Sequence, residues 1–532
     1  MTYWVGSMSA CDVQVAVEDN FLDYYIFMGN IKSVLRNYTT LTGKGQVPPK
    51  WTFGYWQSKI SYSSADETLK IAHEFRDRKI PCDVIHLDSF WFEKDWYCNL
   101  EMDKERFPDP EGYFKELTEL GIKVSLWQLP YIPEGCELFE NIKKVDGFVK
   151  NKDGGIYDVK VLNFIEGFKG ITGIIDFTNP KAVEVYQQAL AKLFKLGAKI
   201  IKTDFGEAAP LDGVYYDGTP GYRMHNCYPL LYNQAAYEVT LKETGEGAVW
   251  ARSACAGGQR YPLHWGGDNS PNFHNIIPQL VGGLSLGLSG FQFWSQDIGG
   301  FMGETYDELL IRWMQVGLFI SHSRIHGYGK REIYKFKEET AKVCTDYINL
   351  RYRLMPYLYS SAVKCVEDSL PMARALVIEY QDDRNVWSIE DQYLLGEYIM
   401  VAPIYTEENR RSAYLPDGVW TDWWTGTRIC GRQWINIEAD IDKLPLYIKE
   451  GGIIPMGPVM DYVDAVKTEN IDLIIAPFEN DGVSHFNLFV NDEIVPITYE
   501  CTNGKHTVKI GKSNVEFHCK LIGEMPYNIE QI

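Results

Sequence analysis

The sequence predicts an α/β fold: a (β/α)₈ TIM barrel followed by C-terminal β-sandwich domains. Between about residues 48 and 370, apolar β runs alternate with amphipathic helices, which predicts βαβ units and a parallel sheet. After about residue 371 the alternation gives way to short strands separated by turn residues, a pattern typical of β-sandwiches. The length of 532 residues fits several domains rather than one.

The first 47 residues form a separate segment, because Pro48 and Pro49 mark a boundary after it. Strand-like pieces at 13–17 and 24–28 precede a helix-like stretch at 31–41. We therefore expect a small β element joined to the barrel by a linker helix.

Six strands stand out in the barrel region, and the segments between them have helical periodicity. The strands are expected at 52–55, 84–87, 122–127, 198–203, 247–251 and 290–294, and the helices at 65–78, 112–120, 180–196, 230–243, 275–286 and 306–320. Six strands over this length leave room for two weaker ones, and no GxGxxG motif follows the early strands. A closed eight-stranded barrel is therefore favoured over an open sheet. A polar insertion at about 131–175 follows the third strand and is expected to shape a substrate site.

The C-terminal part reads as two β domains. A helical stretch at 338–366 ends the barrel, and strands are expected at 374–380, 398–403, 412–415, 420–424 and 446–455. They predict a proximal β-sandwich over 371–458 and a distal β domain over 459–532.

Charge and cysteine usage exclude several classes of partner. With 52 Lys and Arg against 72 Asp and Glu, the net charge of −20 argues against binding to nucleic acid or to an anionic membrane. No signal-peptide pattern opens the chain, and the longest stretch without charged residues, 269–296, is too polar for a membrane span. The eleven cysteines form no CxxC pair, so we expect neither disulfides nor structural zinc, and a cytoplasmic location.

Four acidic residues follow or end predicted strands, where a barrel places its active site. Asp204 follows the strand 198–203, and Asp268 lies in His264-Trp-Gly-Gly-Asp268. One ionised carboxylate and one protonated carboxyl are the minimum equipment for glycoside hydrolysis. Asp88 and Asp297 occupy similar positions after two other strands. His322 and His326 stand four residues apart, but no further ligand completes a set, so no metal site is expected.

Several motifs together resemble glycoside hydrolase family 31 over about residues 12–460. They are Lys202-Thr-Asp-Phe-Gly-Glu207, Ala251-Arg-Ser253, His264-Trp-Gly-Gly-Asp268, Phe293-Trp-Ser-Gln-Asp-Ile-Gly-Gly-Phe301 and Ser321-His-Ser-Arg-Ile-His326. Lys202, together with His86-Leu-Asp-Ser-Phe-Trp91 and Trp96-Tyr-Cys98, is most similar to the α-xylosidase branch. Members usually open with a large β-sandwich, and residues 1–47 resemble only its tail.

The resemblance implies roles for individual residues and requires no cofactor. Asp204 would be the nucleophile and Asp268 the general acid/base of a retaining α-xylosidase. Further residues would bind the sugar: Asp88, Arg252, His326, Lys202, Trp265, Phe301, Trp127 and Asp297. Phe90 and Cys98 would close the space that a glucose hydroxymethyl group needs. Glu207 is expected to orient its neighbours.

Three alternatives stay open at this point. The same chemistry would serve an α-glucosidase or an α-transglycosylase acting on an oligosaccharide or another α-glycoside. A different class would be an inactive carbohydrate-binding or interaction protein, against which the intact Asp204 and Asp268 argue. Assembly into a homo-oligomer is also left open.

Overall fold

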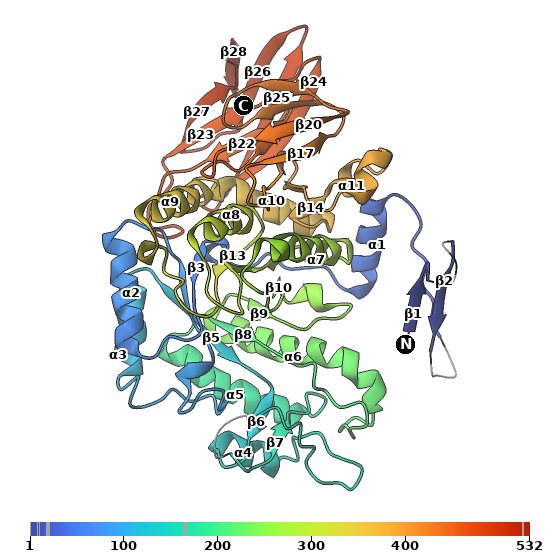
Figure 1. Cartoon of the computed structure of the whole chain (residues 1–532), viewed down its shortest axis with the longest axis vertical. Coiled ribbons are helices and arrows are strands. Elements are labelled where there is room, and N and C mark those ends of the chain that lie inside the picture. Colours follow the sequence, from blue (N-terminus) through green and yellow to red (C-terminus); the bar gives the residue numbers. More distant parts are fainter. Residues whose placement is uncertain (1, 8, 10, 18–21, 163–167, 524–525) are drawn as a thin grey trace.

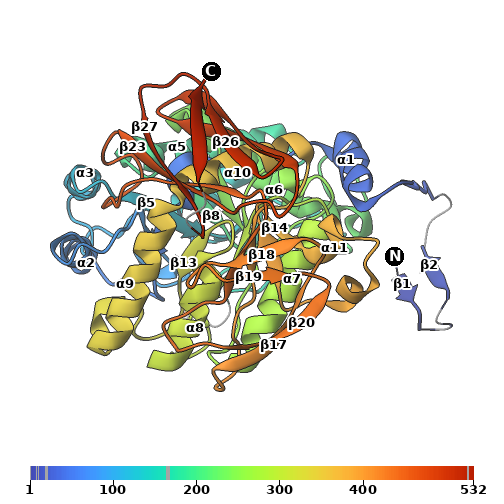
Figure 2. The same ribbon diagram turned by 90° about the horizontal axis from the view of Figure 1, so that it is seen from above.

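The protein is described here by a computed structural model, which covers residues 2–7, 9, 11–17, 22–162, 168–523 and 526–532. A barrel occupies the centre of the molecule, and the C-terminal sheets lie at one end of it (Figure 1). The antiparallel hairpin of β1 (Thr2–Val5) and β2 (Val13–Ala16) projects away from the body in two perpendicular views (Figures 1 and 2). The expected strand at 24–28 is wrong, since these residues are irregular, and α1 (Ile31–Thr42) follows them.

The central sheet closes on itself through one interrupted strand. Its order is β11-β10-β9-β8-β5-β4-β3-β13-β12, and every neighbouring pair is parallel. The strands β11 (Trp294–Ser295) and β12 (Asp297–Ile298), at the two ends of this order, are separated only by Gln296. With 294–298 counted as one strand the barrel has eight, as predicted. The others are β3 (Tyr55–Gln57), β4 (Val84–Leu87), β5 (Lys123–Gln128), β8 (Ile200–Thr203), β9 (Val249–Ala251), β10 (His264–Trp265) and β13 (Ser323–Ile325).

Helices connect the strands, and several of them have a side chain that caps the N-terminus. The side chains of Ser64 and Asn179 accept hydrogen bonds from the first-turn backbones of α2 and α5, which satisfies otherwise unpaired N–H groups. Gly283 of α7 lies against the Trp294 ring, where a Cβ atom would have no room. The helices are α2 (Ala65–Asp77), α3 (Pro110–Glu119), α5 (Pro180–Leu196), α6 (Gly221–Thr244), α7 (Ile276–Leu288) and α8 (Asp307–Leu318).

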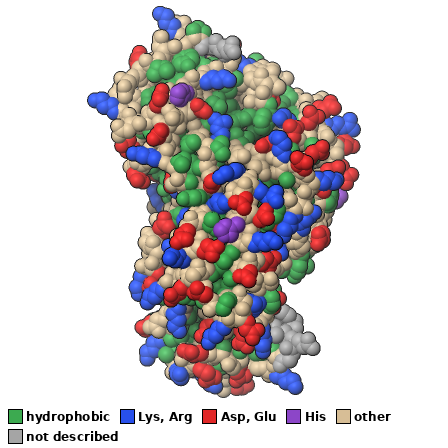
Figure 3. Space-filling model, turned by 90° about the vertical axis from the view of Figure 1, so that its left-hand side faces the viewer, with side chains coloured by type: hydrophobic (Ala, Val, Ile, Leu, Met, Phe, Trp, Pro, Cys, Tyr) green, Lys and Arg blue, Asp and Glu red, His purple; other side chains and the backbone are tan. Residues whose placement is uncertain are grey.

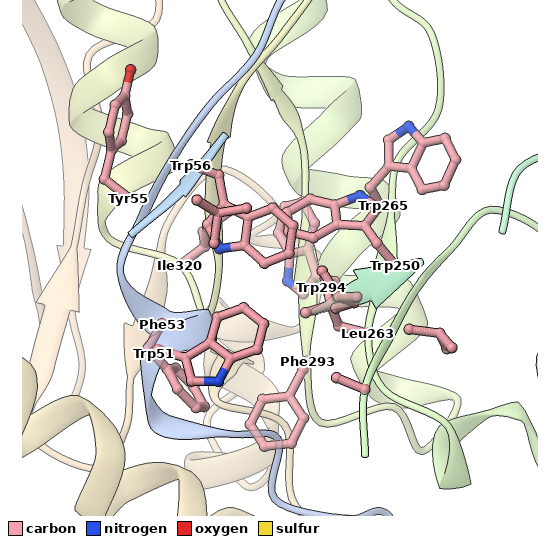
Figure 4. Packing of buried hydrophobic residues seen from close by; sticks show 14 of the residues in the cluster. Trp51, Phe53, Tyr55, Trp56, Trp250, Leu263, Trp265, Phe293, Trp294 and Ile320 are labelled. Atoms are coloured by element: carbon pink, nitrogen blue, oxygen red, sulfur yellow. The ribbon is translucent and has the colours of Figure 1, made fainter. Parts of the chain in front are cut away.

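Aromatic rings fill the interior of the barrel. Trp56 of β3 and Trp250 of β9 come from non-adjacent strands, and their ring centroids are only 4.4 Å apart (Figure 4). Both rings are fully buried. The barrel is therefore a packed core rather than a channel, and only its ends can hold a ligand.

The insertion after β5 contributes a small two-stranded antiparallel sheet and a helix. β6 (Tyr131–Pro133) pairs antiparallel with β7 (Thr172–Ile174), and α4 (Glu137–Lys144) lies between them in the chain. Residues 163–167 of the expected insertion at 131–175 lie outside the described residues. The Tyr131 hydroxyl accepts hydrogen bonds from the backbone N–H groups of Gly206 and Ala208, both at 3.0 Å. The insertion thus supports the loop that follows β8.

Two helices lead from the barrel into the C-terminal sheets. The expected single helical stretch at 338–366 is divided into α9 (Glu338–Arg353) and α10 (Met355–Asp368), with Pro356 in the first turn of the second. A six-stranded sheet and the two-stranded antiparallel sheet of β17 and β20 follow. Their strands are β14 (Ala373–Ala375), β15 (Tyr393–Leu395), β16 (Ile399–Val401), β17 (Arg410–Leu415), β18 (Val419–Asp422), β19 (Arg428–Cys430), β20 (Gln433–Glu438) and β21 (Leu446–Lys449).

The last part of the chain forms two more sheets. One contains β22 (Ile453–Met456), β23 (Asn470–Ile475) and β27 (Glu516–Leu521), and the other β24 (Gly482–Val490), β25 (Glu493–Thr502), β26 (Lys505–Ile510) and β28 (Tyr527–Gln531).

Three sequence expectations were wrong in detail. Residues 50–53 form a 3₁₀ turn ahead of β3. Residues 376–379 form the short helix α11 (Leu376–Glu379) instead of continuing a strand. The expected strand at 446–455 is two strands, because residues 450–452 turn between β21 and β22.

The surface carries charges of both signs. On the face shown in Figure 3, acidic and basic side chains are intermixed. Among the described residues, no helix is both long and apolar enough to cross a membrane.

Candidate active site at the mouth of the barrel

Six of the predicted site residues stand at the carboxyl ends of barrel strands. Lys202 lies in β8 and Asp297 in β12. Asp88, Asp204, Arg252 and His326 each follow the last residue of β4, β8, β9 and β13 respectively. Because all these strands are parallel, their carboxyl ends meet at one mouth of the barrel. Asp268 reaches the same place on the loop three residues after β10.

Asp204 is almost fully buried and surrounded by donors. Its Oδ2 accepts a hydrogen bond of 2.7 Å from Trp127 Nε1 and lies 3.1 Å from Lys202 Nζ. Its Oδ1 accepts hydrogen bonds from the backbone N–H of Phe205 at 2.8 Å and from Arg252 Nη1 at 3.3 Å. Two cations offset the cost of burying this carboxylate, and the hydrogen bonds fix its orientation.

Lys202 connects Asp204 to Asp88 across the mouth. Its ammonium lies 3.3 Å from Asp88 Oδ2 and 4.5 Å from the centre of the Trp265 ring. Only 2% of the lysine is exposed. A buried lysine between two carboxylates keeps both acids and the cation in place.

Asp88 is also held by two buried histidines. Its Oδ2 lies 3.0 Å from His86 Nε2 and 3.3 Å from His326 Nε2. Burial would raise the pKa of Asp88, but Lys202 and the histidines outweigh it and hold that pKa well below its ordinary value. Burial lowers the pKa of both His86 and His326, with Lys202 adding to the effect. The two imidazoles are therefore neutral beside an ionised carboxylate.

Asp268 has a raised pKa, in contrast to the lowered pKa of Asp88. Burial, followed by the negative charges of Asp297 and Asp204, raises its pKa to about 6. About a third of its side chain stays exposed. The site thus contains one carboxyl that keeps its proton up to a higher pH than an ordinary aspartate, next to a second, Asp204, that is surrounded by cations.

Arg252 links the two acids. Its Nη1 lies 3.3 Å from Asp204 Oδ1 and 3.7 Å from Asp268 Oδ2, so the sum of these distances bounds the separation of the two oxygens. That bound includes the roughly 5–5.5 Å separation of retaining glycosidases and excludes most of the roughly 6.5–9.5 Å range of inverting ones, overlapping only its lower end. Glu207 accepts from Arg252 Nε at 2.9 Å and so orients the guanidinium, in line with its expected role.

Aromatic side chains lie beside the charged residues of the mouth. Trp265 and Phe301 are 5% and 9% exposed, and the Phe301 ring lies 5.4 Å from that of His326. Trp127 is buried and fixed by its hydrogen bond to Asp204. Aromatic faces next to carboxylates suit a ligand with an apolar C–H face and many hydroxyls.

Asp297 faces a buried arginine rather than the mouth. Its Oδ1 accepts a short hydrogen bond from Arg324 Nη2, both residues are fully buried, and its Oδ2 has no partner among the described residues. The Arg324 guanidinium lies 4.7 Å and 5.5 Å from the ring centres of Trp250 and Trp265. Asp297 therefore acts on the site through its charge and through Arg324.

Phe90 and Cys98 have their described contacts outside the carboxylate cluster. The Phe90 ring lies 3.8 Å from the Arg106 guanidinium. The fully buried Cys98 thiol donates to the carbonyl of Leu129 at 3.4 Å. Both residues flank the loop after β4 and the end of β5.

Sequence reasoning did not assign four supporting residues. Ser58 contacts His326 Nδ1 at 2.7 Å, and His86 contacts Asp88. The Phe205 ring lies 4.6 Å from the Arg252 guanidinium and 5.5 Å from the Trp96 ring. His86 and Trp96 belong to sequence motifs of the family resemblance, and this membership is the only signal that could have identified them. Ser58 belongs to no motif, so the sequence offers no signal for it.

His322, which stands four residues before His326, is structural. His322 is fully buried and bonds through Nε2 to Thr52 Oγ1 at 3.0 Å. Within the described part of the chain, no cluster of three or more His, Cys, Asp or Glu is arranged to hold a metal ion.

Comparison with protein families gives two adjoining matches. Residues 45–361 match the TIM-barrel domain of glycosyl hydrolases family 31, and residues 369–454 match the C-terminal domain of glycosyl hydrolase family 31.

Individual relatives differ in their named activities. The chain is 34% identical to an α-xylosidase of Emericella nidulans, over 87% of this chain and 60% of the relative. It is 35% identical to α-glucosidase 2 of Bacillus thermoamyloliquefaciens, over 84% and 58%. A dextranase structure from Flavobacterium johnsoniae, complexed with glucose, superposes with a TM-score of 0.82 at 31% identity and covers 90% of this chain and 63% of that one. The chain thus spans about three fifths of the length of these relatives.

Proposed function

Because the chain belongs to glycoside hydrolase family 31, we propose that it removes terminal non-reducing α-linked xylose with retention of configuration. The single observation that carries the reaction is the contrast between the two acids bridged by Arg252. Asp204 has cations and donors on both oxygens, whereas the raised pKa of Asp268 keeps its proton available. Such contrasting environments separate nucleophile from general acid in glycosidases.

In the first step Asp204 attacks the anomeric carbon while Asp268 gives its proton to the leaving oxygen. The glycosidic C–O bond breaks as an ester bond to Asp204 forms. In the second step Asp268, now ionised, takes a proton from water, and the resulting nucleophile displaces Asp204. Arg252 lies next to both acids and compensates the charge that moves between them.

The sugar would lie against Trp265 and Phe301, with its hydroxyls on Asp88, Arg252 and His326. Asp88 is an acceptor, and its position is fixed by Lys202 and two histidines. Arg252 still exposes 29% of its side chain, so it can donate to a ligand. Trp127 and Lys202 would border the subsite next to Asp204, which both of them contact.

Preference for xylose requires that the space of a C5 hydroxymethyl group be occupied. We assign this to the loop after β4, where Phe90 is half-buried beneath Arg106 and Cys98 is packed against Leu129 at the end of β5. Steric exclusion discriminates more strongly than an unfilled pocket, which is worth only about 1–3 kcal/mol. The second candidate function is that of an α-glucosidase, because the chain is 35% identical to an enzyme of that name.

The decisive experiment compares 4-nitrophenyl α-xyloside with 4-nitrophenyl α-glucoside on the same preparation. A higher kcat/KM on the xyloside is expected, together with release of xylose that initially has the α configuration by NMR. Equal rates on both sugars would replace the xylosidase assignment by a broader α-glycosidase, and initial release of β-xylose would contradict retention.

A further inference from the structure

A groove on the side of the molecule, away from the barrel mouth, is centred on the exposed ring of Trp424. Two cavities of about 650 and 550 Å³ share the side chains of Leu350, Arg353 and Trp424. They lie where α9 meets the loop after β18 and the sheet of β22, β23 and β27. The site of Asp204 shares none of these residues.

We propose that this groove is a second, non-catalytic site that binds a neutral oligosaccharide chain. The proposal rests on the proposed function only for the kind of ligand, since the same glycan would be trimmed at the barrel mouth.

Trp424 is a rigid platform. Its backbone N–H and that of Thr425 donate to Asp422 Oδ1 at 2.9 and 2.7 Å, which forms a tight turn. Its indole Nε1 donates to the carbonyl of Leu444 at 2.6 Å. The Tyr347 ring packs edge-on against it at 6.3 Å. The ring is nevertheless 38% exposed, so an apolar sugar face could stack on it without a large loss of side-chain entropy.

Tyr347 fixes the segment beside this platform to the barrel. Its hydroxyl donates to the carbonyl of Asp442 at 3.0 Å and accepts from the backbone N–H of Leu444 at 2.6 Å. Lys443 places its ammonium 4.8 Å from the Trp424 ring centre. The groove is therefore formed before any ligand arrives, which reduces the cost of binding.

Polar groups with spare hydrogen-bonding capacity line the smaller cavity. Asn349 Oδ1 is buried and has no partner among the described residues. Asp346, Asp442 and Glu339 also line it. Hydroxyl groups of a sugar are donors that such acceptors can bind.

The charges of the groove compensate one another. Lys342 pairs with Asp346 at 2.6 Å, Lys443 with Asp442 at 3.1 Å, and Arg353 with Asp472 at 2.7 Å. A phosphorylated or strongly charged ligand would have to break these pairs. An aromatic platform with paired charges and unpaired acceptors favours a neutral, hydroxyl-rich ligand over an anion.

The test is native affinity electrophoresis of the full chain in gels that contain either xyloglucan or dextran. Both polymers offer many internal segments to a surface site. Because the α-xylosyl side chains of xyloglucan can also enter the active site, the comparison with Trp424→Ala assigns the retardation to the groove. Retardation by at least one polymer is expected, and Trp424→Ala should raise the apparent dissociation constant at least ten-fold. Trp387→Ala is the matched control, since Trp387 is an exposed tryptophan (61%) on another part of the proximal sheet region. Its retardation should equal that of the unmodified chain.

Activity separates this proposal from the proposed function. The Trp424→Ala variant should keep kcat/KM on 4-nitrophenyl glycosides within two-fold. Equal retardation of Trp424→Ala and the unmodified chain, or no retardation of the unmodified chain by either polymer, would overturn the second site. Retardation without hydrolysis of either nitrophenyl glycoside would remove the proposed activity and still support the second site. If Trp424→Ala unfolds, Asn349→Ala replaces it, with at least three-fold weaker binding expected and unchanged binding counting against the site.

Discussion

Asp204 and Asp268 lie on either side of one nitrogen atom, Arg252 Nη1, at 3.3 and 3.7 Å. Their surroundings differ although they share this cation. Asp204 is 5% exposed and receives a hydrogen bond from Trp127, while Asp268 is more open and feels the negative charge of Asp297. This asymmetry is the basis on which we propose different roles for two chemically identical side chains.

The first prediction distinguishes the acids by leaving group. Asp204→Ala should abolish turnover of every substrate, because no glycosyl-enzyme can form. Asp268→Ala should lose far more activity on a disaccharide than on a 4-nitrophenyl glycoside, because a good leaving group needs little protonation. Steady-state kinetics on both substrate types measure this. The same proportional loss in both variants would leave the two roles unsupported.

The second prediction concerns pH. Since Asp268 must be protonated in the first step, kcat/KM should fall as pH rises through about 6. The Asp297 charge helps to raise that pKa, so Asp297→Asn should move the alkaline limb to lower pH. Asp95→Asn is a matched control on the neighbouring loop, where Asp95 accepts from Ser89 Oγ. If the alkaline limb of the kcat/KM profile stayed at the same pH in Asp297→Asn, a group other than Asp268 would control it.

The third prediction concerns the buried cation between two acids. Lys202→Met leaves Asp88 and Asp204 without their shared ammonium, and breaking such a buried pair costs about 3–5 kcal/mol of unfolding free energy. The loss of unfolding free energy in Lys202→Met should be smaller at acid pH. Without Lys202 the pKa of Asp88 rises, so Asp88 becomes protonated, and this protonation removes one of the uncompensated charges. Urea unfolding measures it. The exposed Lys115→Met should change stability by less than about 0.5 kcal/mol, and a similarly small effect of Lys202→Met would contradict the bridge.

The fourth prediction concerns Asp83 at the opposite end of β4. This carboxyl is fully buried, accepts from the Tyr352 hydroxyl and from the Val463 backbone N–H, and burial raises its pKa from 3.8 to about 6. The folded state therefore binds a proton that the unfolded state has lost between these values. This group costs about 3 kcal/mol of stability as pH rises from about 4 to about 6.

Replacing Asp83 by Asn removes that titration. The difference in Tm between Asp83→Asn and the unmodified chain should move in favour of the variant as pH rises from 4 to 7. Asp461→Asn, at a half-exposed neighbour of the same junction, should show a constant difference. A constant difference in Asp83→Asn as well would mean that its pKa is not raised.

Much of the barrel could be predicted from the sequence, because apolar strands alternate with helices of clear periodicity. β4 and α5 match their expected ranges. The two strands left unassigned, β10 (His264–Trp265) and β13 (Ser323–Ile325), are short and contain polar residues, so neither stands out as an apolar run. α6 begins at Gly221 rather than near 230, because the buried Pro229 lies inside the helix although proline normally marks a boundary.

The site was predictable where residues follow a strand and unpredictable where they meet across the barrel. Asp88, Asp204 and Arg252 could be placed at the mouth from their positions after strands. The pairing of Asp297 with Arg324 could not, because it joins side chains 27 residues apart in a fully buried contact. Contacts of this kind depend on the packed geometry of the barrel interior, which no local pattern encodes.

Closure of the barrel through residues 294–298 also affects how chains of this protein can associate. A closed sheet has no edge strand, so a second chain cannot extend it by main-chain pairing. In the C-terminal sheets, the edge strand β19 has only three residues and carries Arg428, and the edge strand β28 carries Glu530. Short or charged edges of this kind oppose strand addition and aggregation.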